Sequence, residues 1–191
     1  MRRGRQGSAR GNCQTRPSSN LILLCKDDIT NLNRFVLQRE HEKTGRSIVT
    51  AVINDGLLDG IVEGQNLVIF GYDARPTLFE KAAHLLVKLT FHQCFAEGNK
   101  RTAWEACRVL LGLNEIGIYY NSATVVEICK PIAQLCDKIK DLDELNEELD
   151  CKIREVTDWI KKNAFRIPRL PMLNTMLRAP PVNSPTDEPR S

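Results

Sequence analysis

The chain has 191 residues and a net charge of +3, with 42% hydrophobic and 27% charged residues. This length and composition are typical of one globular domain with short tails, and the apolar runs are too short to span a membrane. The charge is uneven, because residues 1–17 carry +5 and residues 164–191 carry +2, which leaves −4 for residues 18–163. A mildly acidic body argues against a nucleic-acid-binding surface on the fold, so we expect neither a nucleic-acid nor a membrane partner.

The seven cysteines form no CxxC pair, and most of them lie in apolar helical patterns. Cysteine behaves there as a small hydrophobic residue. An odd number of cysteines without metal-ligand spacing favours a reducing compartment, with no disulfide framework and no zinc site. The expected location is therefore the cytoplasm.

The first third of the chain contains weak, short elements. Residues 1–26 are predicted to be a disordered basic arm, which is favoured over an organelle transit peptide. A first helix is predicted over residues 28–43 and a short one over residues 55–63. The apolar run at residues 67–70 predicts a short strand or one arm of a hairpin, since turn residues follow it.

A stronger helix signal begins at Thr77. Thr77 and Glu80 have the spacing of a capping box, in which each side chain satisfies a backbone N–H group of the other residue. This helix is predicted to run to about Cys94. The next helix is expected over residues 99–115, because apolar residues recur there at helical spacing.

The remaining pattern is also helical. A helix begins near Ser122, and Pro131 is expected to kink or restart it, since proline cannot donate a hydrogen bond to the preceding turn. The last long helix is predicted over residues 141–163, with an apolar stripe along one face. Residues 164–191 are predicted to form a proline-rich disordered tail. The pattern as a whole predicts an all-α fold with one short β-hairpin or extended flap.

The most informative stretch is Phe95-Ala96-Glu97-Gly98-Asn99-Lys100-Arg101-Thr102-Ala103. A turn glycine, an asparagine suited to cap a helix and two adjacent cations meet where a helix is predicted to begin. Helix starts have free backbone N–H groups and a positive dipole end. Two cations in that first turn oppose the dipole, and they favour a site for an external anion such as phosphate.

This stretch resembles the Fic/Doc (Fido) family, and most closely its Doc (death-on-curing) branch. That family carries H-x-F-x-(D/E)-G-N-(K/G)-R between two helices of an all-α core, and the Doc branch reads KAA…HPFxDGNKRTA. Here Lys81-Ala82-Ala83 is followed by the nine-residue stretch at Phe95–Ala103. Looser similarity predicts a Fido/Doc-like domain over residues 27–163.

One position departs from the family pattern. The family's catalytic histidine lies two residues before the motif phenylalanine, and Gln93 occupies that position. A glutamine amide can hydrogen-bond a hydroxyl group but cannot take its proton near neutral pH. His92 is one residue earlier, about 100° away around a helix, and is the alternative base. Weak or absent transfer activity is therefore expected.

The resemblance implies roles for the other motif residues. Glu97 corresponds to the acid that holds Mg²⁺ against nucleotide phosphates. Gly98, Asn99, Lys100 and Arg101 correspond to the phosphate-binding residues, so the expected cofactors are ATP and Mg²⁺. Taken without the resemblance, Glu97 is a solvated loop acid, and Asn99 is a helix cap followed by two exposed cations.

The resemblance also implies a reaction type. Fic enzymes that transfer AMP usually have glycine at the position of Lys100, whereas the Doc branch has lysine and transfers the γ-phosphate of ATP to a threonine of elongation factor Tu. Phosphate transfer to a serine or threonine hydroxyl of a protein is therefore expected over AMP transfer. An antitoxin is a further expected partner. The alternative is an inactive Fido-fold protein that binds a nucleotide or an antitoxin.

Three other residues are candidates of lower rank. His41 and His84 are expected to be surface or packing residues rather than catalysts. Cys94 is a candidate nucleophile only if its thiolate is stabilised, and packing of the loop is the favoured interpretation.

Overall fold

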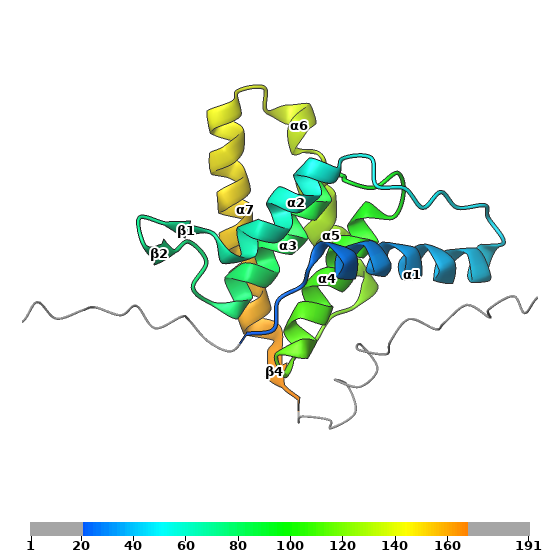
Figure 1. The fold of residues 1–191 in the computed structure, drawn as a ribbon, viewed down its shortest axis with the longest axis horizontal. Coiled ribbons are helices and arrows are strands. Elements are labelled where there is room, and N and C mark those ends of the chain that lie inside the picture. Colours follow the sequence, from blue (N-terminus) through cyan, green and yellow to red (C-terminus); the bar gives the residue numbers. More distant parts are fainter. Residues whose placement is uncertain (1–20, 168–191) are drawn as a thin grey trace, which may run out of the picture.

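The computed structural model describes residues 21–167, and it confirms the predicted all-α class (Figure 1). The helices are α1 (Lys26–Thr44), α2 (Asp55–Glu63), α3 (Leu78–His92), α4 (Asn99–Leu113), α5 (Ser122–Ala133), α6 (Leu135–Lys138) and α7 (Leu142–Asn163), with a 3₁₀ turn at Gly64–Asn66. Two small antiparallel sheets pair β1 (Val68–Ile69) with β2 (Tyr72–Asp73), and β3 (Ile116–Ile118) with β4 (Ala164–Arg166). Most of the predicted arm and tail, residues 1–20 and 168–191, lies outside the described residues.

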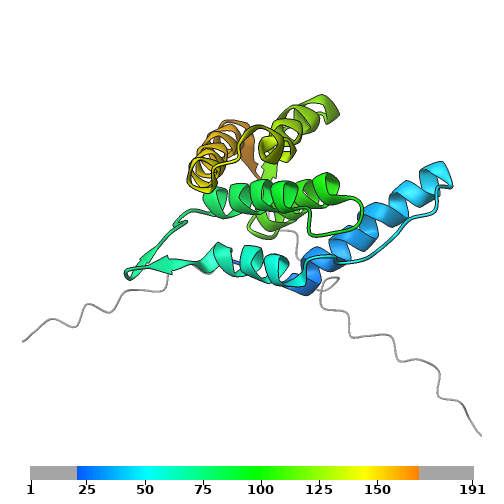
Figure 2. The same cartoon turned by 90° about the horizontal axis from the view of Figure 1, so that it is seen from above.

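Helix α3 is the centre of the fold. It packs against α4, α7, α5 and α2, and its residues 81–87 are all buried. The predicted capping box starts this helix: Thr77 Oγ1 accepts a hydrogen bond from Glu80 N, and Glu80 Oε2 accepts one from Thr77 N. Figure 2 shows α3 and α4 side by side, with α1 extending to one side and the β1–β2 hairpin to the other.

The folded part extends further than the predicted boundaries at residues 26 and 164. Ile22 exchanges two hydrogen bonds with Asn114, and Leu24 is buried. At the other end, β4 pairs with β3, and Ile167 N donates to Glu115 O. Both ends of the described chain therefore meet at the C-terminal end of α4.

A buried lysine anchors the β1–β2 hairpin to the core. Only 2% of the Lys81 side chain is exposed, and its Nζ lies 2.8 Å from Asp73 Oδ2 and donates to the carbonyl of Gln65. The ammonium group thus joins α3 to the strand β2 and to the 3₁₀ turn. Burial also lowers the pKa values of two other cations, Arg75 before α3 and Lys88 in its second half.

His84 is a packing residue, and it predicts how stability depends on pH. Its Nε2 lies 2.9 Å from Ile61 O, and burial lowers its pKa to about 3, with smaller effects of Arg75 and Lys88. Below the unfolded-state pKa of about 6.5, the unfolded chain binds a proton that the folded chain does not. As the pH is lowered from about 6.5 to about 3, the free energy of unfolding should therefore fall by up to about 1.4 kcal/mol per pH unit.

Replacing this imidazole with an amide tests the prediction. His84→Gln keeps an N–H donor for Ile61 O but does not titrate, so its urea-unfolding free energy should depend less steeply on pH between 6 and 4. The exposed His41, which contacts Arg46 O, provides the control His41→Gln, and that variant should keep the parent slope. Equal slopes for all three proteins would contradict the assignment.

Within residues 21–167, no helix is both long enough and apolar enough to cross a lipid bilayer.

Candidate functional site

The connection between α3 and α4 brings the motif residues into one short loop. Helix α3 ends at His92, and Gln93 follows in the left-handed conformation, with φ 47°. Gly98 begins α4 as its N-cap with φ 79°. A Cβ atom at Gly98 would lie 3.1 Å from Leu37 Cδ2 and 3.2 Å from Asn33 Nδ2, so both the backbone angle and the close approach of α1 favour glycine.

Asn99 closes this loop. Its Oδ1 accepts a hydrogen bond from Phe95 N at 2.9 Å, and its Nδ2 donates to Phe95 O at 2.7 Å. The interpretation of Asn99 as the helix cap is therefore wrong, because its amide binds the backbone of the buried Phe95 and Gly98 takes the cap position. In this arrangement Asn99 shapes the loop, and it contributes its backbone N–H rather than its side chain to the helix start.

The first N–H groups of α4 are available for a ligand. Among the described residues, no acceptor is hydrogen-bonded to the backbone N–H of Asn99, Lys100 or Arg101, whereas Thr102 N donates to Gly98 O. Three N–H groups thus point out of a helix start that lies beside a glycine. Such a start has a partial positive charge and suits phosphate oxygens.

Asn33 on α1 binds the loop through its side chain, a role that was not predicted from the sequence. Its Nδ2 donates to Glu97 O at 2.9 Å and to Thr102 Oγ1 at 3.0 Å, and the residue is buried. An asparagine on a helix that otherwise packs through apolar residues is the only local signal, and it does not reveal a partner 64 residues away.

The segment after α1 runs antiparallel beside the loop. Val52 forms a β-bridge with Phe95, Ala96 N donates to Ala51 O, and Ile53 N donates to Cys94 O. Residues 51–53 therefore form a short extended segment beside the loop. It covers one side of the loop with backbone and leaves Gln93 and Ala96 exposed.

Two arginines near the start of α4 form ion pairs with acids. Arg101 Nη1 lies 2.7 Å from Glu40 Oε2, and Arg46 Nη2 lies 3.5 Å from Glu97 Oε1. These ion pairs are partly exposed, and such pairs contribute only about 0–1 kcal/mol each. A phosphate group could therefore displace them at small cost. Lys100 is exposed and makes no ion pair with the described residues.

A shallow hollow of about 170 Å³ lies next to Arg101. Helix α1 contributes Phe35, Arg39 and Lys43 to its wall, and α4 contributes Trp104. Arg39 lies over the ring of Phe35, with 5.6 Å between the guanidinium carbon and the ring centroid. This hollow gives the start of α4 a neighbouring surface with aromatic rings, cations and the acids Glu40 and Glu105.

The fit to Mg²⁺ depends on a single carboxylate. Within the described residues, no three His, Cys, Asp or Glu side chains are grouped as metal ligands, and Glu97 is the acid of the loop. Protein-bound Mg²⁺ often has one or two carboxylates and takes its other ligands from substrate phosphates and water. Glu97 therefore fits a metal that arrives with a nucleotide, after it releases Arg46.

The candidate bases and nucleophile differ in their surroundings. Gln93 is exposed at the mouth of the loop, whereas His92 is half-buried with its ring against Phe91, and burial and Lys88 lower its pKa. Cys94 is fully buried, and burial raises the pKa of its thiol. A stabilised thiolate is therefore contradicted, and Cys94 is a packing residue of the loop.

Comparison with known proteins agrees with this geometry. Residues 23–111 match the model of the Fic/Doc family, so over this stretch the chain is similar to that family. It is 39% identical over 84 residues to Toxin Doc of Mycolicibacterium smegmatis, an alignment that covers 42% of this chain and 65% of the relative. The aligned region thus spans less than two thirds of that relative. No solved structure matches the chain significantly.

Substitution of Asn99 tests whether the loop contributes to ATP binding as well as to stability. Asn99→Ala leaves Phe95 N and Phe95 O without their described partner, which should cost about 1–3 kcal/mol of unfolding free energy and weaken ATP binding. Asn114→Ala is the matched control, because Asn114 makes comparable bonds at the opposite end of α4. It should cost stability without changing ATP affinity, as measured by urea unfolding and calorimetry. Equal ATP affinities of both variants would contradict this role of Asn99.

Proposed function

We propose that this protein is a Doc-like transferase that binds ATP with Mg²⁺ at the start of α4. The single observation that carries the proposal is the set of unbonded N–H groups at Asn99–Arg101, with Gly98 before them and two cations among them. Phosphate binding at such a helix start needs no rearrangement of the backbone.

The side chains around the start of α4 have different proposed roles. Lys100 and Arg101 supply positive charge for the phosphates once Arg101 leaves Glu40. Glu97 is the residue that would hold Mg²⁺, which when bound neutralises phosphate charge. Phosphoryl transfer depends mainly on positioning and charge neutralisation, so this set of groups suits it.

The acceptor side of the site is incomplete. The proposed acceptor is a serine or threonine hydroxyl of a protein, and elongation factor Tu is the candidate that the Doc branch suggests. Gln93 can orient that hydroxyl but cannot remove its proton. We therefore expect slow transfer of the γ-phosphate, and AMP transfer is the less favoured reaction because Lys100 replaces the usual glycine.

Gln93 also supports a second, non-enzymatic function. If Gln93 leaves the chain inactive, the fold remains a nucleotide- or antitoxin-binding protein. The name of the relative, Toxin Doc, supports an antitoxin as a partner in either case. The described cysteines at positions 25, 94, 107, 129 and 151 are free thiols, which supports the proposed cytoplasmic location.

Position-specific labelling tests the proposal. The protein is incubated with Mg²⁺, purified elongation factor Tu or a bacterial lysate, and ATP labelled at the α- or the γ-phosphate. Label from the γ position on a protein supports phosphoryl transfer, and label from the α position supports AMP transfer instead. ATP binding without either transfer would support the non-enzymatic function, and absence of ATP binding would contradict both the transferase and the nucleotide-binding protein, leaving only antitoxin binding.

A further inference from the structure

The β1–β2 hairpin presents apolar side chains to solvent. Val68 is 61% exposed, Tyr72 is 79% exposed and Phe70 is 97% exposed. Phe70 also has a φ of 49°, and Gly71 after it has 84°, so both central residues of this tight turn are left-handed. A bulky residue in that conformation costs energy, and exposing its ring costs more. Apolar segments built in this way mark interaction surfaces.

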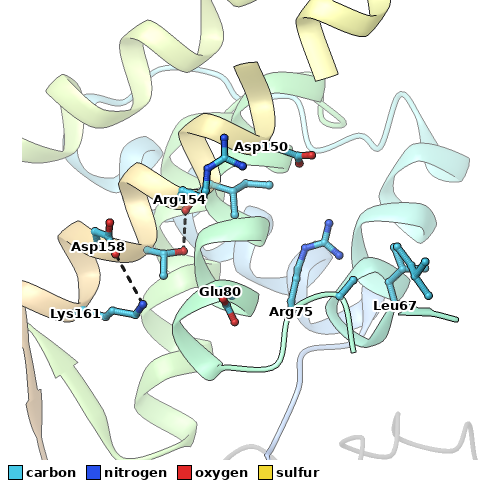
Figure 3. A pocket seen from close by; sticks show the side chains of 11 residues that line it. Leu67, Arg75, Glu80, Asp150, Arg154, Asp158 and Lys161 are labelled. Atoms are coloured by element: carbon cyan, nitrogen blue, oxygen red, sulfur yellow. Dashed lines mark hydrogen bonds and ion pairs between the residues drawn. The ribbon is translucent and has the colours of Figure 1, made fainter. Parts of the chain in front are cut away.

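A groove lies between this hairpin and α7. Figure 3 shows Leu67 and Arg75 on one side of it and α7 residues from Asp150 to Lys161 on the other. The groove has a volume of about 480 Å³. Ile69 and Ile153 add apolar surface to its walls. The groove is large enough to bury several side chains of a bound segment.

The described chain ends close to this groove. Lys161 lines the groove, and Ile167, six residues later, is fixed by its bond to Glu115. The groove runs along α7 from Asp150 to Lys161, about 17 Å at 1.5 Å per residue. The twelve residues 168–179 that follow can span about 40 Å when extended, so they can reach both ends of it.

Those residues have a composition that complements the groove. They contain Leu170, Met172, Leu173, Met176 and Leu177, whereas residues 180–191 contain one large apolar residue, Val182. Arg169 and Arg178 flank the apolar run. The groove is lined by three acids, Glu80, Asp150 and Asp158, and by three cations, Arg75, Arg154 and Lys161, so the match between segment and groove is apolar rather than electrostatic.

We propose that residues 168–179 of this chain bind the groove between the β1–β2 hairpin and α7. Their apolar side chains cover Leu67, Ile69 and Phe70. A segment tethered six residues beyond the groove has an effective concentration in the millimolar range, which favours it over the same segment of a second copy. The proposal does not depend on nucleotide binding or transfer.

Amide hydrogen exchange on the full chain tests this proposal. The parent is compared with Leu173→Asp/Met176→Asp and with the control Val182→Asp/Ser184→Asp, which adds the same charge beyond the segment. We expect backbone amides of residues 67–74 to exchange several-fold faster in the first variant and at the parent rate in the control. Unchanged exchange in α3 shows that the fold is intact.

A synthetic peptide of residues 168–179, added to the first variant, should restore slow exchange at residues 67–74. Equal exchange of the parent and the first variant would overturn the proposal. So would protection of the parent that disappears on dilution, because that result assigns the groove to a second copy.

Discussion

Gln93→His is expected to raise the rate of phosphate transfer by about 10²–10⁴, the usual contribution of a general base. Gln93 is exposed at the mouth of the loop, and its left-handed backbone conformation is one that histidine tolerates better than most residues. The substitution therefore adds a titrating group without straining the turn. ATP affinity should not change, because residue 93 lies outside the start of α4.

The pH profile gives this prediction a second readout. An imidazole with a pKa near 6.5 accepts a proton only in its neutral form, so the rate of the variant should rise with pH through about 6.5 and then level off. The parent protein should show no such rise. Transfer is measured with γ-labelled ATP at saturating concentration.

His92 supplies the rival explanation. If His92 serves as the base, His92→Ala abolishes transfer while Gln93→Ala leaves it unchanged. Its half-buried ring against Phe91 and its lowered pKa argue against this role. A Gln93→His variant that binds ATP normally but transfers no faster than the parent would refute the assignment of position 93.

Lys81→Met is expected to destabilise the fold by about 3–5 kcal/mol, the usual cost of removing one partner from a buried ion pair. The methionine retains the apolar stem, but the Asp73 carboxylate and the Gln65 carbonyl lose the ammonium group that joins them to α3. The hairpin should loosen first, because this lysine is its anchor. Urea unfolding monitored by circular dichroism measures the loss.

The control for this prediction is a partly exposed lysine that pairs with exposed acids. Lys26 Nζ lies 2.7 Å from Asp55 Oδ2 and 2.9 Å from Asp59 Oδ2, and both acids are at least half exposed. Lys26→Met should therefore have a much smaller effect, since solvent screens these pairs. Similar losses for Lys26→Met and Lys81→Met would show that burial of Lys81 contributes nothing.

Local signals in the sequence were sufficient for the helices. The capping box at Thr77 placed the start of α3, and the apolar stripe of α7 placed that helix to within a residue of its end at Asn163. The pairing of β3 with β4 was missed, because three-residue strands 48 positions apart have too little alternation to be recognised. The predicted boundary at residue 164 was wrong for the same reason.

The site was predicted in part. The motif brought Gly98, Lys100 and Arg101 to one helix start, as the sequence indicated. The role of Asn99 differed, because helix-cap preference is local whereas its bonds to Phe95 depend on how the loop closes. Asn33 could not be found from sequence, since its partners Glu97 and Thr102 are distant along the chain.

The affinity for ATP with Mg²⁺ is the most direct test of the proposed phosphate site. It is measured by calorimetry on three proteins: the parent, Lys100→Ala/Arg101→Ala and the control Lys161→Ala/Lys162→Ala. Hydrogen bonds to charged groups contribute about 1.5–3 kcal/mol each, so the first variant should bind at least about tenfold more weakly than the parent. The control removes the same charge from the last turn of α7 and should bind like the parent. Equal affinities for all three proteins would show that ATP does not bind at the start of α4.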